Sequence, residues 1–142
     1  MLATETLGSV SVICSDKTGT LTQGEMRVVE VITETKWISH DGENFSEFIK
    51  PDGDASHLTA LKIGLLCNNA LVENPDDEIH QWSIIGSPTE KALLIAGSAA
   101  GLSKEKLEEK SPRIMELPFE SEHKFMVTGH RVGEDQFVAY LK

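Results

Sequence analysis

The sequence lacks the features that mark membrane-spanning, secreted and nucleic-acid-binding chains. Its 142 residues contain no apolar run approaching the roughly 18 residues of a membrane-spanning helix, and no basic-then-apolar leader. Positive charge is scarce, because 13 Lys and Arg stand against 23 Asp and Glu, for a formal net charge of −10. This balance disfavours nucleic acid and anionic lipid as partners. Any bound nucleotide must therefore be held by a few locally placed cations.

Patterns for metal ligation and disulfide formation are also missing from the sequence. The two cysteines, Cys14 and Cys67, lie far apart and show no metal-type spacing. We expect both to be reduced and buried as small hydrophobic side chains. The five histidines show no ligand spacing either, and we expect them at the surface: His40, His57, His80, His123 and His130. Hydrophobic residues make up 39% of the chain, which is ordinary for a soluble globular domain with one core.

The most informative stretch is DKTGTLT at residues 16–22, which follows an apolar run that we expect to form a strand over residues 8–15. A carboxylate at the end of a strand is held in a narrow position. Gly19 allows the backbone to turn sharply beside a phosphate, and the neighbouring threonine hydroxyls can donate to phosphoryl oxygens. Asp16 is therefore a candidate nucleophile toward phosphorus. The alternative interpretation is a surface turn rich in Thr and Gly.

The rest of the sequence mixes extended and helical patterns without βαβ periodicity. Extended segments are predicted at 26–38 and 82–85 and, from Arg113 onward, at 127–132 and 136–141, the last two joined by a Gly-Glu-Asp hairpin turn. Three helices are predicted: one that follows a cap at Asp54 or Ser56 and ends near Leu66, one from Ser87 to Ala100, and one over 103–110. A loop is predicted at 40–54 and a turn at 74–77. The expected fold class is α/β of the α+β type, an antiparallel sheet flanked by helices over residues 25–142.

The helix that begins near residue 88 has the clearest local signals in the sequence. Ser87 is a good N-cap, Pro88 suits the first helical position, and Glu90 can close a capping box. Gly101 is predicted to end the helix.

Three further strings follow DKTGTLT in a fixed order: CNNA at 67–70, GSPTEKAL at 86–93 and LPFESEHKFM at 117–126. The second fits a Gly-x-x-Thr-Glu-x-Ala-Leu pattern, and the third fits Phe-x-x-x-x-Lys. Together with DKTGTLT, they make the chain similar to the P-type ATPases, and most similar to the type II cation pumps, calcium-type or related. The resemblance extends over essentially all 142 residues.

This resemblance implies two structural units. Residues 1–24 would supply the first strand, the phosphorylation loop and a hinge of a haloacid-dehalogenase-like phosphorylation domain, and residues 25–142 would form the nucleotide-binding domain. Lys142 stands where the family's Lys-Gly-Ala motif begins, and the later Thr-Gly-Asp and Gly-Asp-Gly-x-Asn-Asp motifs do not occur. We therefore expect a soluble, C-terminally truncated fragment from the cytoplasmic portion of an integral membrane protein. Its partners would be the pump's remaining phosphorylation, actuator and membrane domains. The transported cation would bind elsewhere, and the fragment alone would be inactive.

The resemblance makes Asp16 the acceptor of the phosphoryl group. It assigns a Mg²⁺ to Asp16 and the main chain of Thr18, and Thr18 would also contact the nucleotide. Phosphatases with an aspartate nucleophile carry a second aspartate, as general acid/base, where this chain has Thr18. Without that group, attack of water on the acyl phosphate loses a factor of about 10²–10⁴, so the phosphorylated state persists as a pump requires. The alternatives are an aspartate-nucleophile phosphatase and a stand-alone nucleotide-binding module without turnover.

ATP would bind to residues of the second unit. Phe119 is assigned as the stacking surface for adenine, and its polar neighbours favour a partly exposed ring over a core position. Glu90 would contact the base region, a role compatible with capping its helix. Lys124 and Lys142 would line the pocket, the alternative for Lys124 being a solvated surface charge. Calcium pumps commonly carry arginine where this chain has Ser121, so one phosphate contact would be missing.

Overall fold

A computed structural model describes residues 10–17, 19–34, 37–39 and 56–142 of the chain. Thr18, His40, the predicted loop at 40–54 and the cap at Asp54 lie outside these ranges. The elements in chain order are β1 (Glu30–Ile32), β2 (Trp37–Ser39), α2 (Ser56–Leu66), β3 (Leu71–Val72), η2 (Ile79–Gln81), β4 (Ile84–Ile85), α3 (Pro88–Ala99), α4 (Lys104–Lys110), β5 (Arg113–Leu117), β6 (Val127–Arg131) and β7 (Phe137–Leu141).

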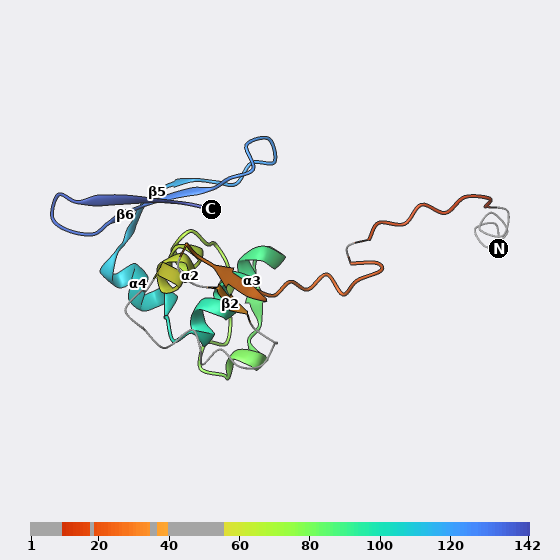
Figure 1. The fold of residues 1–142 in the computed structure, drawn as a ribbon, viewed down its shortest axis with the longest axis horizontal. Helices are drawn as coiled ribbons and strands as arrows, with labels where there is room; N and C mark the ends of the chain where they lie inside the picture. The colour runs from red at the N-terminus through yellow and green to blue at the C-terminus, as the bar shows by residue number, and fades with distance from the viewer. Residues whose placement is uncertain (1–9, 18, 35–36, 40–55) are drawn as a thin grey trace.

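All strand pairing within the described residues is antiparallel. β1 pairs with β2, β3 pairs with β4, and β5, β6 and β7 form a three-stranded sheet in that order. This sheet, drawn in blue, lies to one side of the packed helices, and α4 leads into it (Figure 1). The expected α+β class, with antiparallel sheets and flanking helices, is confirmed. Because β3 and η2 are only two and three residues long, they leave no periodic pattern, and neither was predicted.

The core lies mainly between α2 and α3. Leu65 and Leu94 are buried together, and Leu102 and Leu107 pack against the same cluster. The helices approach closely where Gly97 faces Leu65, because a Cβ atom on Gly97 would lie 2.6 Å from the Cγ atom of Leu65. A side chain at position 97 would therefore force the helices apart or displace Leu65.

Local signals placed α3 correctly. The Ser87 hydroxyl accepts a hydrogen bond from the Glu90 N–H, the Glu90 carboxylate accepts one from the Ser87 N–H, and Pro88 occupies the first turn. The helix ends at Ala99, just before Gly101 with its φ of +80°. Capping needs only residues that are adjacent in sequence, which is why the sequence predicted it.

The β6–β7 hairpin was also predicted, and its register positions the end of the chain. Val127 pairs with Leu141, and the backbones of Met126 and Lys142 exchange hydrogen bonds of 2.7 and 2.9 Å. Thr128 and His130 lie on the buried face of the sheet, whereas Phe137 and Leu141 on β7 are exposed.

The expected strand at 8–15 is not formed over its described residues. Positions 10–15 are exposed and carry no strand pairing, with Ile13 85% exposed. A strand is stable only beside a hydrogen-bonded neighbour, and no described residue pairs with this segment. Cys14 is accordingly exposed and not buried, in contrast to Cys67, which is buried as expected.

Two further expectations need correction. Within the extended segment predicted at 26–38, the structure has two short strands, β1 and β2, that pair antiparallel, because β-branched composition favours extended backbone without revealing which residues pair. His57 and His130 are fully buried and not at the surface. His130 has polar partners in the core, since its ring nitrogens lie 2.9 Å from the Ser111 carbonyl oxygen and 2.9 Å from the Thr128 hydroxyl.

Candidate nucleotide site and phosphorylation motif

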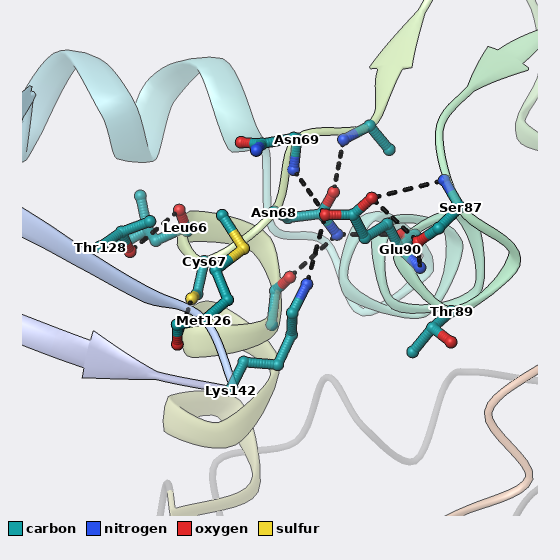
Figure 2. Close-up of polar contacts among 12 residues, drawn as sticks. Leu66, Cys67, Asn68, Asn69, Ser87, Thr89, Glu90, Met126, Thr128 and Lys142 are labelled. Carbon is teal, nitrogen blue, oxygen red and sulfur yellow. Dashed lines mark hydrogen bonds and ion pairs between the residues drawn. The ribbon is translucent and has the colours of Figure 1, made fainter. Parts of the chain in front are cut away.

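Glu90 lies at the centre of a cluster formed by three separate parts of the chain (Figure 2). Its Oε1 atom accepts a hydrogen bond of 3.1 Å from the Asn69 N–H and lies 3.4 Å from the Lys142 ammonium. Its Oε2 atom accepts 2.9 Å from the Ser87 hydroxyl and 3.4 Å from the Ser87 N–H. Only 15% of the Glu90 side chain is exposed, so these partners replace most of its water.

The charge state of Glu90 follows from these contacts. Burial alone raises the pKa of the Glu90 carboxyl, because it disfavours the charged form. The hydrogen bonds from the Asn69 N–H and from Ser87, together with the Lys142 ammonium, outweigh burial and lower the pKa below its ordinary value. Glu90 is therefore a carboxylate at neutral pH, held for accepting hydrogen bonds and pairing with a cation.

The CNNA string forms the loop that leaves α2. The buried Asn68 amide donates 3.0 Å to the Gly64 carbonyl and 2.9 Å to the Glu90 carbonyl, and its Oδ1 atom accepts 2.7 Å from the Ala70 N–H. Asn68 thus ties α2 to α3, and it places the next residue, Asn69, beside the Glu90 carboxylate (Figure 2). Sequence reasoning did not give Asn68 or Asn69 a role. The sequence signal that could have found them is a pair of neighbouring amide side chains just after the helix that ends at Leu66.

Phe119 and Lys124 lie in the loop between β5 and β6. The Phe119 ring is 57% exposed, as its polar neighbours predicted, and is not a core residue. Lys124 is exposed with a φ of +61°, and its N–H donates 2.8 Å to the Glu120 carbonyl. Because this loop follows Leu117 and precedes Val127, it leaves the sheet at the end where Lys142 lies. The register therefore places this loop and the Glu90–Lys142 pair at one end of the sheet.

Residues 16–17 and 19–22 of DKTGTLT are exposed, and hydrogen bonds close a tight turn among them. The Lys17 carbonyl accepts hydrogen bonds from the N–H groups of Leu21 (3.0 Å) and Thr22 (3.2 Å), and Gly19 has the positive φ of +77° that this turn needs. Asp16 is exposed, and among the described residues no cation lies within ion-pair distance of its carboxylate. The segment that precedes β1, red at its start, extends away from the helices and the three-stranded sheet (Figure 1).

Asp16 suits a magnesium ion as a single ligand, because Mg²⁺ prefers carboxylate oxygens and binds through one or two of them beside phosphate. Within the described ranges, no group of three or more His, Cys, Asp or Glu side chains could hold a metal by itself. The other residue assigned to Mg²⁺, Thr18, lies outside the described residues.

A separate cavity of about 1150 Å³ borders α3, where Pro88 and Lys91 line it. Its lining includes Met26, Trp82 and Ile95, but none of the residues assigned to the nucleotide. Its charged lining is mostly acidic, with Glu25, Asp77 and Glu78 against Lys91. A triphosphate would be repelled there, so on charge the Glu90–Lys142 cluster is the better candidate.

None of the helices that the structure describes has the length and apolar character needed to cross a membrane.

Comparison with known proteins gives matches over nearly the whole chain. The chain is 42% identical to a calcium-transporting ATPase 1 of Bacillus cereus, over 95% of this chain and 14% of that protein. It is 38% identical to a probable cation-transporting ATPase F of Mycobacterium bovis (96% and 16%) and 37% identical to the cation-transporting ATPase pma1 of Synechocystis (90% and 15%). The chain therefore spans about one seventh of the length of these relatives.

A family model gives the same result. The model of the P-type ATPase cytoplasmic domain N matches residues 57–142, the part that holds α2, α3, α4 and the three-stranded sheet. This match covers more than half of the chain, and the relatives extend it toward the N-terminus. The chain belongs to the P-type ATPase family, and residues 57–142 are its cytoplasmic domain N.

Proposed function

We propose that this chain is the ATP-binding and phosphorylation-site portion of an ATP-driven cation pump that passes through an aspartyl phosphate. The observation that carries the proposal is the meeting of three separate motifs at one carboxylate. The Glu90 carboxylate of GSPTEKAL contacts both Asn69 of CNNA and Lys142 directly. Residues so far apart in sequence have no local reason to converge, whereas a ligand site needs such convergence.

Each residue assigned to the nucleotide has a distinct task toward ATP. The half-exposed Phe119 ring offers a face to adenine, and by analogy with base–aromatic stacking it contributes about 1–3 kcal/mol. The Glu90 carboxylate accepts a hydrogen bond from the amino group of the base. Lys124 and Lys142 line the pocket and attract the negatively charged nucleotide, which matters in a chain with a net charge of −10.

Phosphoryl transfer falls to Asp16, which is exposed and therefore accessible. One carboxylate oxygen forms a bond to the γ-phosphorus of ATP, the bond from that phosphorus to the β–γ bridging oxygen breaks, and ADP leaves. A Mg²⁺ held by Asp16 and the Thr18 main chain would offset the repulsion between carboxylate and phosphate. The hinge around Gly19 and Gly24 would bring the nucleotide site to Asp16.

Thr18 affects how fast water hydrolyses the phosphorylated aspartate. A hydroxyl at this position is not a general base at neutral pH, so water attack is slow until another part of the pump supplies one. The same residue disfavours a phosphatase. A nucleotide-binding module without turnover remains the second candidate, because the segment that precedes β1 extends away from the helices and the three-stranded sheet in this structure (Figure 1).

The partners in this proposal are the other domains of the pump, on the cytoplasmic side of a membrane, and the transported cation, which binds outside this chain.

Titration with ATP, followed by NMR, tests the nucleotide site. We expect Phe119→Ala to weaken binding by about 1–3 kcal/mol because the stacking surface is lost. Phe137 is the matched control, since its ring is 59% exposed and lies on β7 at the opposite end of that strand from Leu141. Equal losses in Phe119→Ala and Phe137→Ala would mean that Phe119 is not the stacking surface.

A further inference from the structure

Two cations bind the carbonyl oxygens of the loop that follows α2. One guanidinium nitrogen of Arg113, Nη2, lies 2.8 Å from both the Leu66 and the Asn68 carbonyl oxygens. The buried Lys104 ammonium lies 2.9 Å from the Asn68 carbonyl oxygen and 2.8 Å from that of Ala70. The last carbonyls of a helix have no partner within the helix, and cations there are favourable.

The Asn68 carbonyl and the Asn69 N–H belong to one peptide group, and this connects the cations to Glu90. A peptide group is planar and trans, so its C=O and N–H bonds point in opposite directions. Arg113 and Lys104 both hold the Asn68 oxygen on one side. The Asn69 N–H is thereby directed to the other side, where the Glu90 Oε1 atom accepts it at 3.1 Å.

Arg113 also fixes the side chain of Asn69. Its second guanidinium nitrogen, Nη1, lies 2.5 Å from the Asn69 Oδ1 atom and 3.1 Å from the Glu116 carboxylate, which in turn accepts 2.7 Å from the Asn69 amide. Glu108 faces the same guanidinium at 3.8 Å. Two carboxylates therefore offset the charge of Arg113, and its planar set of donors is the feature that a lysine could not replace.

We propose that Arg113, assisted by Lys104, is a positioning residue of the nucleotide site, which orients the 68–69 peptide and thereby holds the Glu90 carboxylate in place. This inference rests on the proposed function, because it assigns Arg113 to the same site. Arg113 does not touch the nucleotide, and it acts only through Asn69 and Glu90. Neither Arg113 nor Lys104 lies in the motifs that identify the site in the sequence.

The test uses the 142-residue chain as Arg113→Lys and Arg113→Gln, with Arg131→Gln as control, since Arg131 is an exposed arginine on the adjacent strand β6. Three quantities are measured by NMR: hydrogen exchange of the Asn69 amide, the pKa of Glu90, and the affinity for ATP. In both Arg113 variants we expect about tenfold faster Asn69 exchange, a higher Glu90 pKa and about tenfold weaker ATP binding. The control should match the wild type in all three.

The Lys variant keeps the charge and loses the paired donors, so it separates orientation from simple attraction. If Arg113→Lys leaves Asn69 exchange and the Glu90 pKa at their wild-type values, the positioning role is refuted. Weaker ATP binding without any change at Asn69 or Glu90 refutes it as well. If the wild-type chain does not bind ATP, the proposed function fails, while Asn69 exchange and the Glu90 pKa still report whether Arg113 orients the peptide.

Discussion

Two glycines on facing helices should respond to the same substitution with opposite signs. Gly97 on α3 and Gly64 on α2 both lie in the α2–α3 interface. A Cβ atom at Gly97 would come within 2.6, 2.7 and 2.9 Å of three atoms of the fully buried Leu65 side chain. A Cβ atom at Gly64 would meet a single close neighbour, the Leu93 Cδ2 atom at 3.3 Å.

The expected magnitudes follow from two competing effects. Replacing glycine by alanine inside a helix contributes up to about 1 kcal/mol through helix propensity. Overpacking a well-filled core costs about 1–3 kcal/mol, and the branch point of the fully buried Leu65 side chain lies closest to the added methyl group. We therefore expect Gly97→Ala to destabilise the chain by about 1–2 kcal/mol. Gly64→Ala should be neutral or stabilising by up to about 1 kcal/mol, because the end of the half-buried Leu93 side chain can shift.

Urea unfolding, followed by circular dichroism at 222 nm, measures both variants against the wild type. The two substitutions add the same methyl group, and each lies within a helix, so the difference between them isolates the packing contribution. A Gly97→Ala variant as stable as Gly64→Ala would show that α2 and α3 do not approach as closely as described.

Four further outcomes are expected. Ser87→Ala should cost about 0.5–2 kcal/mol of stability in urea unfolding by removing the N-cap of α3, and a nucleotide affinity that falls as well would reveal how far Glu90 depends on the cap. Because the pKa of Glu90 is lowered in the folded chain, its carboxylate stabilises the fold at pH values above its ordinary pKa of 4.5. This stability is lost as the pH falls through the folded-state pKa. Glu90→Gln should therefore flatten that part of the pH–stability curve, and an unchanged slope would contradict the lowered pKa of Glu90. In the complete pump, Asp16→Asn should abolish the hydroxylamine-sensitive phosphoenzyme. Thr18→Asp should speed its decay in quenched flow, and unchanged decay would mean that Thr18 does not set the lifetime.

The elements predicted well are those whose signals are local. Ser87, Pro88 and Glu90 specify the start of α3 within four residues, and the Gly-Glu-Asp turn specifies the β6–β7 hairpin. The strand expected at 8–15 failed for a physical reason, because strand formation depends on a neighbour that the segment itself does not encode. His130 was misplaced for a related reason, since alternation along β6 does not reveal which face packs on the helices.

Some residues of the candidate site could likewise be predicted from the sequence, and others could not. A motif resemblance selected Glu90 and Lys142, and the structure places them in contact. The path from Arg113 through the 68–69 peptide could not be predicted, because it joins backbone carbonyls to side chains more than forty positions away. Periodicity and motif spacing describe side chains only, so they do not show which backbone groups need partners.

The two carboxylate oxygens of Glu90 have different partners, and this has a consequence for ligand binding at the proposed site. Oε2 holds the first turn of α3 through Ser87, while Oε1 faces Asn69 and Lys142. In the proposed site, a ligand would compete for Oε1 and displace Lys142 without unwinding the start of the helix. An aspartate would be one methylene too short to serve both sides, and an amide would present a donor to one of them. The length and symmetry of a glutamate side chain let this position support the fold and exchange partners at the same time.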